Sequence, residues 1–187
     1  MTDSSGRTGV LPAQMIRAMI DQGQIAAPTP IDPGQIQPAS LDLRLGTQAW
    51  RMRASFLAGR GRRVADRLAE FEMHRMEIGA GAVLEKGCVY LVPLMENLAL
   101  PADIQAVANA KSSTGRLDLL TRVITDEGVE FDRVGPGYTG PLYAEICPRS
   151  FSVLVRPGMR LNQIRFRRGH AVLTDAELTE LHARTQL

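Results

Sequence analysis

The sequence is poor in the residues on which metal and disulfide chemistry depend. It has two cysteines and three histidines among 187 residues, and aromatic residues make up 5%. Cys88 and Cys147 are far apart, so they form neither a disulfide framework nor a paired metal motif, and they are typical of a reducing cytosol. His74, His170 and His182 are also scattered, without an HxE or CxxC motif. We therefore expect no zinc and no catalytic metal, although the fold could still bring two histidines together.

Charge and hydropathy argue against two further classes of partner. The formal net charge of +2 provides no global field for nucleic acid or membrane binding. The most apolar run, CVYLVPLMENLALPA, is interrupted by Pro93 and Glu96, and the polar opening MTDSSGRTG lacks the apolar stretch of a signal peptide. The basic run in residues 51–63 is interrupted by glycines and is interpreted as a solvated loop. We expect a cytoplasmic protein with no nucleic-acid or membrane partner.

What the sequence does contain is a series of short strand patterns. Its length and its 44% hydrophobic content fit one globular domain, which we assign to residues 11–187, with residues 1–10 as a disordered N-terminus. Leu41, Leu43 and Leu45 alternate with polar residues, which predicts a half-buried strand. Further strands are predicted in AVLEKGCVYLVPL, TRVIT, GPLYAEICP, FSVLVRP and MRLNQIRFR.

Three helices are expected beside these strands. The stripe in LPAQMIRAMIDQGQI predicts the first, RRVADRLAEFEMHRM the second, and the capping-box spacing of Thr174 and Glu177 predicts the third over TDAELTELHAR. Many short strands, with helices mostly near the ends, favour an antiparallel sandwich or barrel over a βαβ fold.

The segment KSSTGR is the first candidate for binding chemistry. Lys111, Ser112, Ser113 and Arg116 stand together directly before an apolar segment. The residues alone leave two interpretations open. Serine at an N-cap can satisfy free backbone N–H groups at the start of a helix. Cations and hydroxyls at a helix N-terminus also suit a phosphate.

Glu145 is the second candidate. It lies in GPLYAEICP with no other charge nearby in sequence, and alternation places it on one strand face with Tyr143 and Cys147. Partial desolvation on such a face would favour a role as a general base, whereas a glutamate on an edge strand would simply face water. The sequence has no GxSxG elbow and no dinucleotide or Walker fingerprint.

Four motifs together resemble those of a known family. They are QPASLDLRLG (37–46), KSSTGRLDL (111–119), VGPGYTGPLYAEI (134–146) and RPGMRLNQIRF (156–166). Their order and spacing are similar to those of the dCTP deaminases, within the trimeric dUTPase-like superfamily, over roughly residues 11 to 170. The resemblance implies a mainly β, dUTPase-like distorted β-barrel or jelly roll with short peripheral helices at the N- and C-terminal ends. It also implies a homotrimer with active sites at subunit interfaces.

The resemblance implies roles for particular residues. Lys111, Ser112 and Ser113 would contact the phosphates of dCTP. Glu145 would activate water for attack on cytosine C4, and Arg116 would support the reaction centre. The base and sugar would be bound by Val123, Ile124, Thr125, Asp126 and Tyr138, the first three through their backbone. No metal would act at the reacting carbon, and Mg²⁺ would enter only with the triphosphate.

The sequence departs from the family pattern at three places. The connection 126–134 is longer than usual, and Gly135 stands where the family has an aspartate that contacts the sugar; Asp126 or Asp132 could replace it. Asp118 stands where glycine is common. The chain ends at ELHARTQL without the arm that closes over the triphosphate, so it resembles the N-terminal half of a longer tandem form.

The resemblance implies hydrolytic deamination of dCTP to dUTP and ammonia, in the pathway that supplies dUMP and dTTP. A dUTP diphosphatase or a bifunctional deaminase–diphosphatase is the alternative enzyme, which Gly135 disfavours. The alternative of another class is a non-catalytic nucleotide-binding half of a tandem protein.

Overall fold

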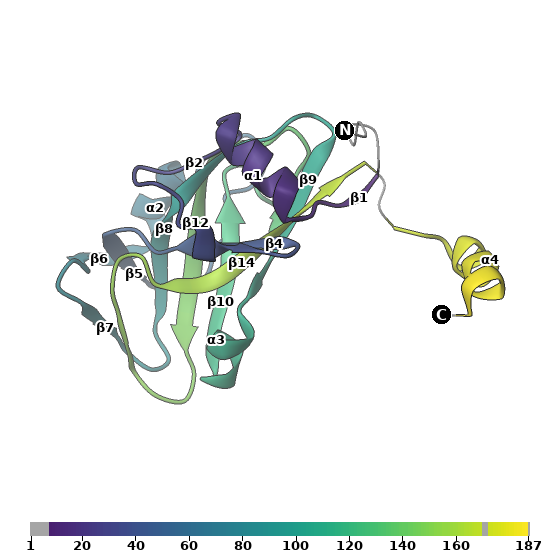
Figure 1. The fold of residues 1–187 in the computed structure, drawn as a ribbon. Coiled ribbons are helices and arrows are strands. Elements are labelled where there is room, and N and C mark those ends of the chain that lie inside the picture. Colours follow the sequence, from purple (N-terminus) through teal and green to yellow (C-terminus); the bar gives the residue numbers. More distant parts are fainter. Residues whose placement is uncertain (1–7, 170–171, 187) are drawn as a thin grey trace.

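Two antiparallel sheets form the body of the protein in the computed structural model, which describes residues 8–169 and 172–186 (Figure 1). The first sheet has the order β11-β9-β14-β4-β3, with β1 beside β14, and the second has the order β10-β12-β8-β5-β6, with β2 beside β8. The strands of the first sheet are β1 (Gly9–Val10), β3 (Ile36–Gln37), β4 (Ser40–Arg44), β9 (Ile104–Ala110), β11 (Arg133–Val134) and β14 (Arg160–Arg168). Those of the second sheet are β2 (Ile25–Ala26), β5 (Gln48–Met52), β6 (Glu72–Glu77), β8 (Val89–Ala99), β10 (Leu119–Thr125) and β12 (Thr139–Pro148).

The remaining elements lie around these sheets. Strands β7 (Ala82–Leu84) and β13 (Val153–Val155) form a separate two-stranded sheet. The helices are α1 (Ala13–Asp21), the 3₁₀ helix η1 (Pro33–Gln35), α2 (Val64–Phe71), α3 (Ser112–Arg116) and α4 (Asp175–Thr185). Helix α3 lies at one end of β10, and α4 stands apart from the sheets (Figure 1). Within the described part of the chain, no helix is long and apolar enough to cross a membrane.

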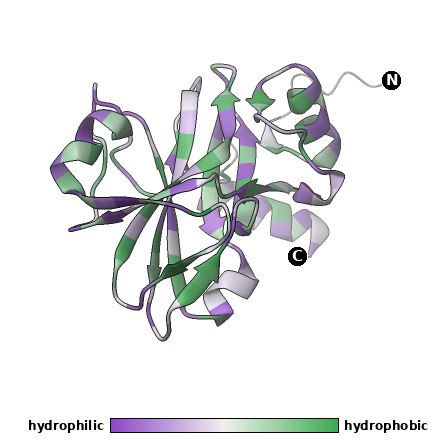
Figure 2. Ribbon diagram, turned by 90° about the vertical axis from the view of Figure 1, so that its left-hand side faces the viewer, coloured by the Kyte–Doolittle hydropathy of each residue, from purple (hydrophilic) through white to green (hydrophobic). Residues whose placement is uncertain are grey.

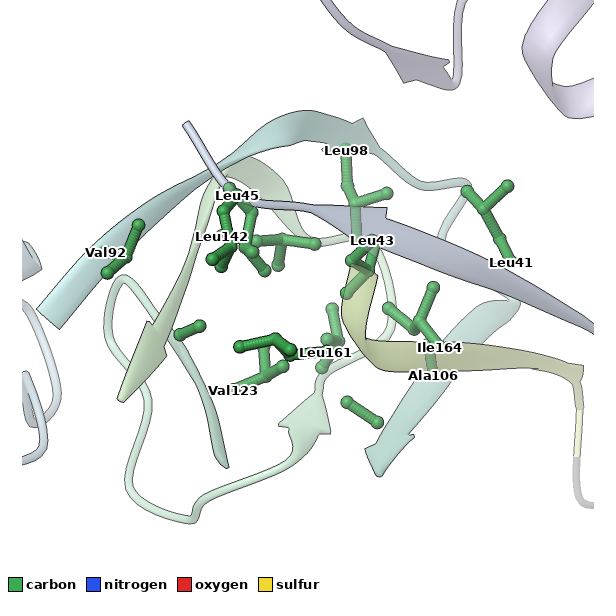
Figure 3. Close-up of a cluster of buried hydrophobic side chains, with 14 of the residues drawn as sticks. Leu41, Leu43, Leu45, Val92, Leu98, Ala106, Val123, Leu142, Leu161 and Ile164 are labelled. Carbon is green, nitrogen blue, oxygen red and sulfur yellow. The ribbon is translucent and has the colours of Figure 1, made fainter. Parts of the chain in front are cut away.

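The main hydrophobic core lies between the two sheets. Leu41, Leu43 and Ile164 from the first sheet meet Val123 and Leu142 from the second, and each is at most 1% exposed (Figure 3). Green and purple bands alternate along many strands in Figure 2, as expected when one face of a strand is buried. The predicted mainly β, dUTPase-like fold with short helices is confirmed, although its strands form two distorted sheets rather than a closed barrel.

The predicted strand around Leu43 is present as β4, but the expectation that it is half-buried is wrong. All five of its residues are buried. Its two charged side chains are covered because each finds a partner inside the protein: Asp42 is paired with Lys111, and Arg44 with Glu96. A polar residue in an alternating pattern therefore need not face water when another element supplies the opposite charge.

Two other boundaries differ from the sequence predictions. The second helix ends at Phe71 instead of continuing to residue 76, because Glu72–Glu77 form β6 and pair with β5. Of the predicted disordered N-terminus, Gly9 and Val10 instead form β1 and pair with Arg168 and Arg167 of β14. Residues 1–7 of that segment lie outside the described residues.

A second, smaller core covers the outer face of the second sheet. Phe56, from the segment between β5 and α2, and Val64, the first residue of α2, pack with Leu91 of β8 and Ile124 of β10. The Phe56 ring stacks on that of Phe71, with 4.8 Å between centroids. The basic run 51–63, predicted to be a solvated loop, thus contributes buried residues to a layer over the sheet.

Candidate active site

Glu145 lies under this outer layer. It is on β12, opposite Arg122 of β10, and only 4% of it is exposed. Tyr143, two residues away on β12, packs into the same smaller core, as strand alternation predicts. The alternative of a glutamate facing water is therefore wrong. No charge lies near Glu145 in sequence, but strand pairing brings one to it.

Arg122 is the charged partner of Glu145. Its Nε donates to Glu145 Oε1 at 3.1 Å, and its Nη2 donates to the same oxygen. The guanidinium carbon lies 3.6 Å from the ring centroid of Phe131, so the cation is held between a carboxylate and an aromatic face. The Arg122 side chain is 29% exposed. The Glu145 carboxylate is thus buried but lies next to a group that reaches solvent.

Ser55 completes the surroundings of this carboxylate. Its hydroxyl donates to Glu145 Oε2 at 2.6 Å and accepts from Arg122 Nη2 at 3.1 Å. Each oxygen of Glu145 therefore has its own donor. Neither Ser55 nor Arg122 was predicted from the sequence, because strand pairing and the covering segment bring them to Glu145 and no local motif marks them.

The predicted phosphate-binding residues lie on and beside α3, the short helix that precedes β10. Lys111 is the N-cap of this helix, and its ammonium group is paired with Asp42, which is 2% exposed. Ser112, Ser113 and Arg116 are exposed, and their side chains form no hydrogen bond or ion pair with any other described residue. The helix start therefore exists, but it has no side-chain cap, so the serines do not serve the capping role considered above.

These residues are separated from Glu145 of the same chain. Arg122, the partner of Glu145, lies three residues beyond the start of β10, which corresponds to about 10 Å of strand. Asp118, at the turn between the two elements, has φ of 51°, a left-handed conformation that glycine adopts most easily and aspartate tolerates. That conformation explains why glycine is common at this position.

The residues predicted to read the base through their backbone already have partners. Val123 N donates to Asp132 Oδ1 at 2.8 Å, and Val123 O accepts from Asp132 N at 2.9 Å. Thr125 O accepts from Gly128 N at 3.2 Å. The side chain of Ile124 is fully buried in the smaller core. A nucleotide base that hydrogen-bonds to the Val123 backbone would have to displace Asp132.

A pocket of about 550 Å³ lies at the Thr125 end of β10. Of the predicted base and sugar residues, Thr125, Asp126 and Tyr138 line it, together with Gly135. Asp126 Oδ1 accepts from the backbone N–H of Val64 at 2.7 Å, so it caps the start of α2. Other lining residues come from the long connection 126–134. This connection also hydrogen-bonds to the segment that covers Glu145.

Burial affects the phenol of Tyr138 in this pocket. The hydroxyl donates to Pro141 O at 2.6 Å and accepts from Asp126 N at 3.2 Å. Desolvation is the main cause that raises the pKa of Tyr138 well above its usual value, and the hydrogen bond from Asp126 N opposes it. Tyr138 is therefore a neutral hydrogen-bonding group at any physiological pH.

Comparison with known proteins identifies the family. The family model for the 2'-deoxycytidine 5'-triphosphate deaminase N-terminal domain matches residues 7–170, which is most of the chain. The chain belongs to the dCTP deaminase family. A dCTP deaminase from Natronomonas pharaonis is 31% identical over 81% of this chain and 76% of its own length. A Nocardioides protein named "dCTP deaminase, dUMP-forming" is 32% identical over 79% of this chain and 73% of its own length.

A solved structure of a family member has the same fold. The dCTP deaminase from Agrobacterium tumefaciens is 56% identical to this chain and superposes with a TM-score of 0.89. The match covers 96% of this chain and 54% of that one. The present chain thus spans about half the length of this relative, and the other relatives named above match it over most of their length.

Metal ligands do not gather in the described part of this dCTP deaminase family member. Residues 8–169 and 172–186 contain no group of three or more His, Cys, Asp or Glu side chains that could hold a metal ion. His74 is exposed on β6, and His170 lies outside the described residues. The absence of zinc chemistry stays a prediction.

Proposed function

We propose that this protein deaminates dCTP to dUTP and ammonia by hydrolysis. The observation that carries the proposal is the Glu145 carboxylate, buried on β12 with Arg122 and Ser55 as donors, in a chain of the dCTP deaminase family. A carboxylate in this position can accept a proton from water as a general base. Oε1 accepts two N–H groups from Arg122, whereas Oε2 accepts only from Ser55 and keeps a free lone-pair direction for that water.

The proposed reaction needs one proton acceptor and one attacking oxygen. Glu145 accepts a proton from water while the oxygen attacks C4 of cytosine. The carboxyl group then returns the proton toward the ring and the leaving amine, so that dCTP and water give dUTP and ammonia. Fixed donors stabilise the charge that develops on the tetrahedral intermediate, a contribution that is large in many enzymes. Arg116 is our candidate for this role.

A homotrimer with shared active sites would explain the separation of the site residues. Arg116, Ser112 and Ser113 are exposed, without partners in the described part of their own chain, and lie away from its Glu145. In our proposal these residues of one subunit complete the site of a neighbour. Lys111, Ser112 and Ser113 would contact the triphosphate, and Mg²⁺ would arrive on the phosphate oxygens that it prefers as ligands. Light scattering that reports an active monomer would contradict this arrangement.

The base and sugar would occupy the pocket at the Thr125 end of β10. Asp126 and Tyr138 line it, and Asp132 lies beside it on the Val123 backbone. In our proposal, the base reaches Val123 when Asp132 is displaced, while Thr125 and Ile124 hold the strand in place. We also propose a cytoplasmic location, which is supported by the free thiols of Cys88 and Cys147.

A bifunctional deaminase–diphosphatase is the second candidate. Its support is the name of the Nocardioides relative, which is described as dUMP-forming. Because dUMP formation requires cleavage of the triphosphate, the two candidates differ in one product. The chain is incubated with dCTP, and ammonia and pyrophosphate are measured separately. Ammonia alone supports the deaminase, both products support the bifunctional enzyme, and neither product refutes the proposed function.

A further inference from the structure

The segment between β5 and α2 brings a hydroxyl to Glu145 from a distant part of the chain. Ser55 Oγ donates to Glu145 Oε2 at 2.6 Å, across 90 positions of sequence. Arg122 occupies the other carboxylate oxygen with two N–H groups. The two donors therefore approach the carboxylate from different elements, and each controls one oxygen.

The Ser55 contact matters because of how a glutamate side chain rotates. The last torsion of glutamate joins a tetrahedral carbon to a planar carboxylate, and such torsions have broad, shallow preferences. Arg122 holds only Oε1. The carboxylate could therefore turn about its last bond if Oε2 had no donor. A second donor on Oε2 removes this freedom.

The neighbours of Ser55 in the chain are firmly held. Arg53 N donates to Phe71 O at 2.9 Å, on one side. Phe56, on the other side, is 7% exposed and stacks on Phe71. Ser55 thus sits between two fixed points, although the residue itself is exposed. Its hydroxyl is preorganised for Glu145 and costs little ordering entropy when the substrate binds.

The long connection 126–134 braces the same segment. Gly59 N donates to Gly128 O at 2.9 Å, and Glu127 N donates to Arg62 O at 2.8 Å. Asp126 caps α2 through Val64 N. The connection that departs from the family pattern therefore supports the segment that carries Ser55, in addition to the Phe56–Phe71 stack.

We propose that Ser55 is a positioning residue for Glu145, which sets the orientation of the carboxylate for proton transfer from water. The inference rests on the proposed deaminase activity and adds a residue to that same site. Ser55 acts through Glu145 and does not itself contact the reacting atoms.

The test compares three variants of the full chain with the wild type. Ser55→Ala removes the hydroxyl, Ser55→Thr keeps it, and Ser152→Ala is the control. Ser152 Oγ accepts from Lys86 N at 3.1 Å in an exposed turn that belongs to no part of the proposed site. Initial rates of ammonia release from dCTP give kcat and KM, and thermal unfolding gives Tm.

We expect Ser55→Ala to lower kcat about ten- to a hundredfold, because small misplacements of a catalytic group cost rates of this order. KM and Tm stay near wild type, Ser55→Thr recovers most of kcat, and Ser152→Ala changes none of these values. Wild-type kcat in Ser55→Ala overturns the proposal. So does a loss of kcat that follows a loss of Tm and is not recovered by threonine, because a merely structural contact would behave in this way.

A crystal structure of Ser55→Ala separates this inference from the proposed function. If the wild type releases no ammonia, the proposed function fails, yet the variant still shows whether Ser55 fixes the carboxylate. A rotated Glu145 carboxylate, or one in two orientations, supports the positioning role. A carboxylate in its wild-type orientation overturns it.

Discussion

Two buried glutamates in this protein are each paired with an arginine, and they differ in what surrounds the pair. Glu96 is fully buried, and it accepts from Arg44 Nε at 2.8 Å, Arg44 N at 2.8 Å and Gln35 Nε2 at 2.9 Å. Arg44 also donates to Thr29 and Pro30, and its side chain is 10% exposed. Glu145 instead accepts hydrogen bonds from Arg122, whose side chain is 29% exposed, and from Ser55, which is also exposed.

The difference shows how the same ion pair can serve stability or chemistry. The Glu96 pair is enclosed by protein donors and ties the 29–35 loop to β4 and β8. Both residues that donate to its carboxylate, Arg44 and Gln35, are buried. The Glu145 carboxylate instead contacts the partly exposed Arg122 and the exposed Ser55. A substrate that moves these two side chains slightly can therefore reach the carboxylate. An arginine–glutamate pair alone therefore does not indicate a catalytic site, whereas access to the carboxylate does.

The first prediction concerns a variant that breaks the Glu96–Arg44 ion pair, for which we expect the largest effect on stability. Glu96→Gln leaves the Arg44 guanidinium buried without a counter-charge, which typically costs about 3–5 kcal/mol in the free energy of unfolding. Chemical denaturation measures this loss. Glu145→Gln is the matched control and should cost much less, because Arg122 can turn toward water. Equal losses in the two variants would contradict the distinction drawn between the pairs.

The second prediction concerns the free hydroxyls on α3. Replacing Ser112 and Ser113 by alanine should weaken dCTP binding about tenfold or more for each bond lost to a phosphate, since hydrogen bonds to charged groups are worth about 1.5–3 kcal/mol. Because both residues are exposed and unpaired among the described residues, Tm should not change. Calorimetry with dCTP measures the affinity.

Lys111→Ala provides the contrast to the serine variants. It should weaken dCTP binding and also lower Tm, because it leaves the buried Asp42 without its cation. If the serine variants bind dCTP as the wild type does, α3 is not the phosphate site.

The third prediction is the smallest and concerns pH. Burial is the main cause that raises the pKa of Asp132 above its ordinary value of 3.8. The ionised carboxylate is therefore disfavoured in the folded state, so wild-type stability relative to Asp132→Asn should be greatest below pH 3.8 and should fall as pH rises through the raised pKa. Asparagine keeps an oxygen for Val123 N and tolerates the φ of 61° at this position. A relative stability that rises with pH would contradict this sign.

The sequence predicts local structure well where local contacts decide it. The stripe of the first helix places Ile16 and Met19 in the core, and Thr174 and Glu177 form the expected capping box. Prediction fails where a distant partner decides. The helix predicted over 62–76 ends early because Glu72–Glu77 pair with β5, and the polar face of β4 is buried because Lys111 and Glu96 reach it.

The candidate site follows the same rule. Glu145 was identifiable because it is a charge in an apolar strand, and KSSTGR because its polar residues are adjacent in sequence. Ser55 and Arg122 carry no local signal and meet Glu145 only through the paired strands and the covering segment. An alternating pattern indicates that a glutamate is buried, but it does not indicate what holds it.

The central claim is that Glu145 accepts the proton from water, and Glu145→Gln tests it most directly. Glutamine keeps the shape and can still accept from Arg122, but it cannot act as a base. The measurement is ammonia release from dCTP by wild type and variant at equal concentration, with circular dichroism and light scattering to show that fold and assembly are unchanged. We predict a loss of kcat of roughly 10²–10⁴-fold. Turnover near the wild-type rate in a folded Glu145→Gln variant would contradict the account.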